Sequence, residues 1–344
     1  MEVKLLLTFP VGIEDVVREE IREKIDSCII EESPLDTPGK LIIQLPESKR
    51  NVVSSLRSVD SIMDYLGSFK VDKDKSALDK ICQEILNIDF PEDFRNASSF
   101  RVTCDRRGKH DYTSMDVEKA VGQVLVDKYR LKVKLEGFEA NVFIEIVEDA
   151  CFVGLLREEY LRGRYFVFHH PAAIKPSIAY AMIKLADVKP GMTILDPMCG
   201  GGTILIEAAL TLSDVKLYGF DISEYFLEGG VLNSEAMSLS DRIIFKKVDC
   251  RNLSKIVDFK VDRIITNPPY GTKPIFKINP RPLYLKCLIE MSKVLAKDGK
   301  IVIITIKPDC VKNALDKAGL KIEHERTVKH NDTNPEIIIL TKNG

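Results

Sequence analysis

Two kinds of hydrophobic patterning divide this chain into an N-terminal and a C-terminal half. In the first half, residues 13–25 place apolar side chains three and four positions apart with charges between them, which predicts an amphipathic helix. Further helices are expected at residues 48–57, 76–87 and 114–128, and strands at 3–8, 40–45, 99–104, 142–147 and 150–155. The last two strands follow each other closely and predict a hairpin. Alternation of this kind, with antiparallel returns, indicates small α+β modules.

The second half has a more regular rhythm of strands and helices. Strands are expected at residues 193–196, 216–221, 243–249, 263–266 and 300–306, with helices at 203–212, 224–239 and 283–296 between them. This order predicts a parallel, doubly wound sheet. Two late strands, at residues 320–328 and 336–341, are expected to pair antiparallel at one edge. The halves join around residues 160–171, where arginines and aromatics follow no clear period.

Composition narrows the class of protein. The 344 residues suffice for two or three domains, and 45% hydrophobic with 30% charged residues is typical of an ordinary globular protein. No apolar run approaches the roughly 20 residues that span a bilayer. The eight cysteines show no Cys-x-x-Cys spacing, so neither a zinc finger, another metal site nor a disulfide framework is expected. We therefore expect a cytoplasmic protein without metal.

A glycine-rich turn opens the second half, and acids follow the next strands. Asp196 ends the first of these strands, directly before the turn at residues 200–202; Asp221 ends the second, and Asp249 the third. Glycines allow backbone amides to approach a ligand, and a carboxylate in the position of Asp221 accepts from ribose hydroxyls. A tight turn without ligand is the simpler alternative, but three acids ending consecutive strands argue against it. Asp196 would repel a pyrophosphate yet suits an amino group, so S-adenosylmethionine fits better than a dinucleotide.

The fourth strand ends in Asn267-Pro268-Pro269-Tyr270. An amino nitrogen on a nucleic-acid base is a poor nucleophile because its lone pair is delocalised into the ring. The Asn267 oxygen and a prolyl carbonyl can accept its two hydrogens and hold it in line with a methyl group, while Tyr270 offers a face for stacking. The alternative is a proline turn with a core tyrosine. The combination with the acids predicts amino methylation of a flipped-out base.

Three further residues are weaker candidates. A cysteine nucleophile would suit carbon methylation of pyrimidines, but Cys199 lies in the glycine turn and is expected to pack there. His169 and His170 could touch cofactor or substrate, although a linker histidine is more often a surface or capping residue.

These motifs resemble the class I, Rossmann-like methyltransferases of the amino-methylating group, and the resemblance covers nearly the whole chain. The stretch at residues 100–110 with the helix around 120–122 looks like a THUMP RNA-binding domain. The opening Phe9-Pro10-Val11-Gly12-Ile13-Glu14 is similar to the ferredoxin-like module that precedes THUMP, and residues 170–176 to the usual entry into the catalytic domain. The implied domains are a ferredoxin-like module (1–70), THUMP (71–157), a linker (158–172) and the methyltransferase (173–344).

The resemblance implies an archaeal-type tRNA guanine-N2 methyltransferase that acts on position 6 of the acceptor stem with S-adenosylmethionine as cofactor. We expect a monomer. By matching motif, the cofactor residues would be Asp196, Gly200, Gly202, Asp221 and Asp249, and the catalytic residues Asn267, Pro268 and Tyr270. Gly201 departs from the serine of many relatives, which we expect to be tolerated.

Three alternative functions remain open. Related enzymes that act on position 10 share the domain plan but usually carry aspartate where this chain has Asn267. A DNA adenine-N6 methyltransferase would use a similar tetrad, although the N-terminal half resembles no DNA-reading domain. The chain could also be a non-catalytic RNA-binding factor. Between residues 95 and 134, ten Lys or Arg face five Asp or Glu in a chain of net charge -2, which favours a local phosphate-binding surface over mere solvated charge.

Overall fold

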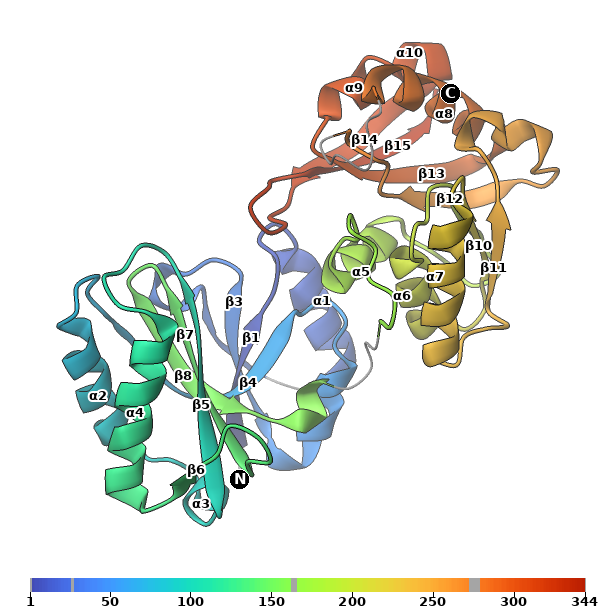
Figure 1. Ribbon diagram of the computed structural model, residues 1–344. Coiled ribbons are helices and arrows are strands. Elements are labelled where there is room, and N and C mark those ends of the chain that lie inside the picture. The colour runs from blue at the N-terminus through green and yellow to red at the C-terminus, as the bar shows by residue number, and fades with distance from the viewer. Residues whose placement is uncertain (1, 26–27, 162–165, 272–278, 344) are drawn as a thin grey trace. The chain divides into compact units, whose positions relative to one another are not determined.

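The computed structural model describes residues 2–25, 28–161, 166–271 and 279–343 (Figure 1). The chain forms two compact units, one of Met1–Phe9 with Arg18–Arg162 and one of Pro10–Val17 with Gly163–Gly344. The short segment Pro10–Val17 groups with the second unit, although it lies near the start of the chain.

A single eight-stranded sheet organises the first unit, in the order β2-β3-β1-β4-β8-β7-β5-β6. Its strands are β1 (Glu2–Thr8), β2 (Cys28–Glu32), β3 (Lys40–Pro46), β4 (Ser61–Lys70), β5 (Ser99–Arg107), β6 (Lys132–Val133), β7 (Ala140–Val147) and β8 (Ala150–Leu156). The pairs are antiparallel except that β5 runs parallel to β6 and β7. One continuous sheet thus spans both of the modules expected in this half.

The helices of the first unit bury apolar side chains. They are α1 (Glu14–Lys24), which begins in the segment shared with the second unit, α2 (Ala77–Asn87), α3 (Glu92–Arg95) and α4 (Ser114–Tyr129). Helices α2 and α4 contact each other, and α4 contacts β5. Thr113 caps α4 through a reciprocal pair of bonds with Asp116, which satisfies backbone donors that the first turn leaves open. The core beneath contains Phe90, Phe94 and Phe100.

The second unit is a seven-stranded sheet in the order β11-β10-β9-β12-β13-β15-β14. Its strands are β9 (Thr193–Asp196), β10 (Lys216–Asp221), β11 (Ile243–Lys247), β12 (Val261–Thr266), β13 (Leu295–Thr305), β14 (Leu320–Thr327) and β15 (Glu336–Lys342). The first five are mutually parallel, and β15 runs antiparallel to both of its neighbours. The predicted doubly wound α/β sheet and its antiparallel edge pair are confirmed.

Two groups of helices contact this sheet from opposite faces (Figure 1). One group is α5 (Pro176–Leu185), α6 (Thr203–Thr211) and α7 (Glu224–Ala236), and the other is α8 (Pro280–Val294), α9 (Pro308–Lys312) and α10 (Leu315–Ala318). Strands buried on both faces read as nearly continuous apolar runs, as β13 does at residues 301–304, all of which are buried. The ends of these strands are therefore held rigidly.

Several expectations differ from the structure. Residues 48–57 are not an α-helix, because Glu47–Ser55 adopts 3-10 geometry with only Val53 buried and so lacks a helical apolar face. Strands β2, β4 and β6 and the short helices α3, α9 and α10 had not been predicted, and the helix predicted at 283–296 ends at Val294, where β13 begins. In β4 the alternation is broken by Asp64, a buried carboxylate paired with Arg157, and by a register shift between Tyr65 and Gly67.

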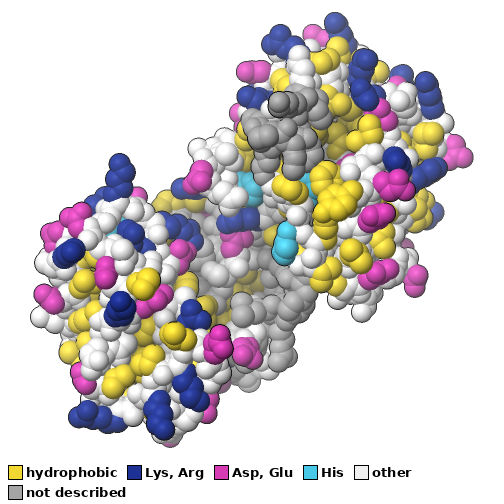
Figure 2. Space-filling view, in the orientation of Figure 1, with side chains coloured by type: hydrophobic (Ala, Val, Ile, Leu, Met, Phe, Trp, Pro, Cys, Tyr) yellow, Lys and Arg dark blue, Asp and Glu magenta, His cyan; other side chains and the backbone are white. Residues whose placement is uncertain are grey.

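Of the expected linker at residues 158–172, positions 162–165 lie outside the described residues. Among the residues that are described, no helix is long and apolar enough to cross a membrane, and no group of three or more His, Cys, Asp or Glu is arranged to hold a metal ion. Lys and Arg side chains are interspersed with Asp and Glu on the face that Figure 2 shows.

Candidate active site

Three carboxylates converge where neighbouring parallel strands end. Asp196 is the last residue of β9, Asp221 the last of β10, and Asp249 follows β11 by two residues. Because β11, β10 and β9 are adjacent and parallel, their carboxyl ends meet at one edge of the sheet. All three acids line one cavity of about 570 Å³ within the second unit. The sequence-predicted acids are thus brought together.

The glycine turn between β9 and α6 has a backbone that side chains would strain. Gly200 and Gly202 have φ angles of +50° and +81°, in the left-handed region. The Gly200 N–H donates to Asp221 Oδ2 at 2.9 Å, and Asn233 of α7 donates from Nδ2 to the Gly201 carbonyl at 3.0 Å. Gly201 itself does not have a positive φ, so its backbone conformation is open to other residues.

The three acids differ in charge state. Asp196 is 2% exposed, and burial raises the pKa of its carboxyl to about 7 even though the Met198 N–H donates to it at 3.1 Å. Burial also raises the pKa of Asp221. The Arg251 side chain bonds both oxygens of Asp249, and these bonds lower the pKa of that carboxyl. At neutral pH Asp249 is therefore ionised, whereas the more deeply buried Asp196 changes its charge near pH 7.

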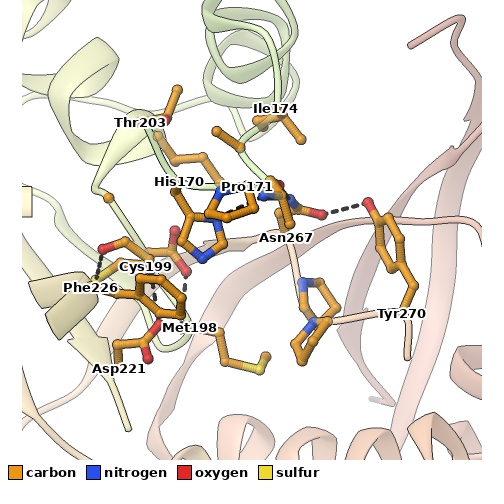
Figure 3. Close-up of a pocket in the computed structure, with 18 of the residues that line it drawn as sticks. His170, Pro171, Ile174, Met198, Cys199, Thr203, Asp221, Phe226, Asn267 and Tyr270 are labelled. Atoms are coloured by element: carbon orange, nitrogen blue, oxygen red, sulfur yellow. Dashed lines mark hydrogen bonds between the residues drawn. The ribbon is translucent and has the colours of Figure 1, made fainter. Parts of the chain in front are cut away.

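Asn267 and Tyr270 are held in a defined orientation at the end of β12 (Figure 3). Asn267 donates from Nδ2 to the Ala172 carbonyl at 3.0 Å, which directs its Oδ1 the other way. The Tyr270 hydroxyl donates to that Oδ1 at 2.5 Å. An amide oxygen has two lone pairs, so Oδ1 retains one acceptor position. Pro268 and Pro269 line the same cavity.

The weaker candidates separate in the structure. His170 lines the cavity; its ring lies 4.2 Å from that of Phe226, centroid to centroid, and packs against the glycine turn, where a Cβ on Gly200 would meet it at 3.2 Å. His169 is not among the described residues that line the cavity. Burial raises the pKa of the Cys199 thiol well above its usual range, so this thiol is a poor nucleophile.

Sequence reasoning had missed several parts of the cavity wall. Phe226 comes from the first turn of α7, and the Ala172 carbonyl from the segment before α5. The turn between β14 and β15 contributes His330–Thr333, about 60 residues past the tetrad. No period or motif marks these positions, although the predicted edge pair of strands implied a turn near them.

Known proteins resemble this chain along nearly its whole length. Residues 163–336 match the family model described as an RMKL-like methyltransferase domain, and residues 75–156 match the THUMP domain. The chain is 28% identical to a tRNA (guanine(6)-N2)-methyltransferase of Archaeoglobus fulgidus, over 98% of this chain and 92% of that protein. It is 31% identical to a tRNA (guanine(10)-N2)-dimethyltransferase of Methanocaldococcus jannaschii, over 72% and 74%. The crystal structure of TrmN from Thermus thermophilus aligns with a TM-score of 0.74 and 28% identity, covering 99% of this chain and all of that one.

Proposed function

The chain belongs to the RMKL-like methyltransferase family, and from this premise we propose that it transfers a methyl group from S-adenosylmethionine to the exocyclic N2 of a guanosine in tRNA. The observation that carries the proposal is the convergence of Asn267 and Tyr270 with three strand-end acids in one cavity. The two hydrogen bonds that orient the Asn267 amide favour a catalytic site over an RNA-binding factor without activity.

The described residues fit this cofactor. Bound S-adenosylmethionine would supply an electrophilic methyl group attached to a sulfonium sulfur. The oxygens of Asp221 are already oriented by the backbone N–H groups of Gly200 and Ser223, both at 2.9 Å, and keep lone pairs for ribose hydroxyls. Asp196 would hold the amino group of the methionine part, and Asp249 would accept from the adenine amino group. Gly202 with Gly200 shapes the turn that lets the backbone approach.

At the acceptor end, Asn267 Oδ1 and the Pro268 carbonyl would each accept one hydrogen of the guanine N2. Holding both hydrogens directs the nitrogen lone pair at the methyl group, so catalysis comes from positioning and from fixed dipoles. The Asn267–Ala172 bond prevents the amide from flipping, which would present a donor to the amino group instead. Tyr270 would provide the stacking surface for the flipped base.

The N-terminal unit would hold the RNA. Residues 75–156 match the THUMP domain, and of the ten basic residues between positions 95 and 134 none is buried and eight are exposed. Exposed lysine and arginine favour phosphate contacts. The boundaries at residues 70, 157 and 172, a monomeric state and a cytoplasmic location stay predictions.

We place the target at position 6 of the acceptor stem. The A. fulgidus relative named for guanine 6 aligns along 98% of this chain. The family resemblance of the tetrad, by its Asn267, favours the same group. Position 10 is the second candidate, since the M. jannaschii relative named for guanine 10 is 31% identical.

The test is methyl transfer from labelled S-adenosylmethionine to tRNA transcripts, followed by mass spectrometry of nuclease fragments. Replacing guanine 6 by adenine should abolish acceptance, whereas replacing guanine 10 should not. Asn267→Ala protein serves as the control, because it should bind the cofactor and lack turnover. The opposite transcript pattern would transfer the assignment to position 10, and label in neither transcript nor the natural tRNA would refute the proposed activity.

A further inference from the structure

The hairpin between β14 and β15 ends in a tight turn beside the candidate active site. His330 and Thr333 exchange backbone hydrogen bonds of 2.9 and 3.0 Å, and the Thr333 hydroxyl donates to the His330 carbonyl at 2.8 Å. Only Asn331 and Asp332 lie between them, with Asn331 in the left-handed region at φ +53°. All four residues line the cavity that contains Asn267 and Tyr270. These bonds close the base of the turn, and the residues at its tip line the cavity.

A segment from the start of the chain supports this hairpin. The Lys329 N–H donates to the Val11 carbonyl at 2.9 Å, and Arg326 forms a bidentate pair with Asp15 at 2.7 and 3.0 Å. Gly12 packs so closely that a Cβ there would lie 2.2 Å from the Thr327 carbonyl oxygen, and its φ is +99°. The segment Pro10–Val17 belongs by its contacts to the same compact unit as the hairpin. These contacts restrict the directions in which the tip can move.

Asp332 is the cavity carboxylate that the proposed chemistry does not use. Four aspartates line the described part of the cavity, and Asp196, Asp221 and Asp249 lie at the ends of β9, β10 and β11. Asp332 comes instead from the far edge of the sheet, beyond β12 and β13. Its side chain is exposed, and among the residues that the structure describes it has no hydrogen-bond or ion-pair partner. Its oxygens are therefore acceptors that no donor among the described residues occupies.

Guanine carries a hydrogen-bond donor, its N1–H, that the Asp332 carboxylate could bind. The tetrad holds only the N2 amino group, which 2-aminopurine also carries, so it cannot by itself select guanine. Guanine differs by an N1–H donor beside N2, whereas 2-aminopurine has an N1 lone pair that a carboxylate repels. Flipped bases are read by hydrogen bonds to this edge, and sites built around such a bond reject analogues that lack it.

We propose that the Asp332 carboxylate accepts the N1–H of the target guanine, so that the hairpin tip is the element that selects guanine. This inference rests on the proposed function and adds its specificity determinant. Arg326, Asp15 and Gly12 are positioning residues, which act by holding the tip against the cavity.

The experiment compares two tRNAs that carry guanine or 2-aminopurine at the target position, each methylated by the full chain in single turnovers. Wild-type protein should strongly prefer guanine. Asp332→Ala should slow guanine methylation by about 10- to 100-fold, the scale for losing one hydrogen bond to a charged group, without slowing 2-aminopurine. The ratio of the two rates should therefore fall by the same factor. Arg326→Gln should lower the ratio in the same direction, a change that loss of stability alone would not produce.

Asp241→Ala is the matched control, because Asp241 is an exposed aspartate outside the described cavity lining and should leave both rates unchanged. An Asp332→Ala protein that keeps the wild-type ratio would overturn the inference while leaving the methyltransferase activity in place. If the wild-type protein methylated neither RNA nor natural tRNA, the proposed function itself would fail. The two failures are thus distinguishable.

Discussion

Affinity for S-adenosylmethionine should depend on pH through Asp196. Burial raises the pKa of this carboxyl to about 7, and the proposed ligand for it is a cationic amino group, which binds the ionised form. Below pH 7 the cofactor must first displace a proton, so affinity should rise with pH and level off above about 7. Each pH unit below the pKa weakens binding by at most about tenfold, or 1.4 kcal/mol. Between pH 7.5 and pH 5.5 we therefore expect a loss of roughly 25-fold.

The free energy of unfolding depends on pH in the opposite direction. Between pH 3.8, the ordinary pKa of the carboxyl, and about 7 the folded protein holds a proton at Asp196 that the unfolded chain has lost. The contribution of Asp196 to the free energy of unfolding should thus fall as pH rises through this window, in the absence of cofactor. Melting curves with and without cofactor would report both trends.

Calorimetric titration between pH 5.5 and 8.5 checks the prediction, with Asp196→Asn as the control. The amide has no proton to lose, so its weaker binding should show a much flatter pH dependence. Asp221, whose pKa burial also raises, remains in the variant and accounts for any residual slope. Equal slopes in the two proteins would refute the role given to Asp196, as would a wild-type affinity that does not change with pH.

Three further changes test the rest of the site. Asp221→Ala should weaken cofactor binding by about 1.5–3 kcal/mol in calorimetry, because its hydrogen bonds to ribose are lost, and unchanged affinity in a folded protein would remove it from the site. Tyr270→Phe should retain more single-turnover activity than Tyr270→Ala, because it keeps the stacking face and loses only the hydroxyl bond to Asn267; equal losses would argue against stacking. Gly201→Ser should change cofactor affinity by no more than about threefold, because φ at this position is not positive and a Cβ there would meet its nearest neighbours at 3.4 Å. A large loss of affinity in calorimetry would show that the turn needs glycine at this position.

The strand ends of the second unit were predictable because they obey two strong local rules. Each of the parallel strands β9 and β12 contains two adjacent buried aliphatic residues, and the polar residue that ends such a strand or follows it lies at the edge of the sheet where ligands bind. Asp196, Asp221 and Asn267 all follow that rule. Their convergence then required only that the strands be neighbours, which the order of the sheet provides.

The first unit was harder because tertiary contacts outweigh its local pattern. Strand β4 contains a charged residue, Asp64, whose buried carboxylate is bound by Arg157 and Tyr160, more than 90 residues away, and also pairs with Arg50 at 3.5 Å. Strand β2 has few buried side chains and pairs with β3 through a register shift. Neither partner nor shift is visible in a window of ten residues.

Most of what the sequence did not reveal lies on the substrate side of the proposed reaction. The three acids of the cofactor side each follow from a strand end, and the tetrad, which also comes at a strand end, was predicted in the same way. The Ala172 carbonyl before α5 and the hairpin tip at Asp332 come from turns that no motif marks. Substrate selection in this fold is therefore expected to reside in turns such as 330–333, and the supporting contact from Val11 to Lys329 makes even the opening turn of the chain part of that selection.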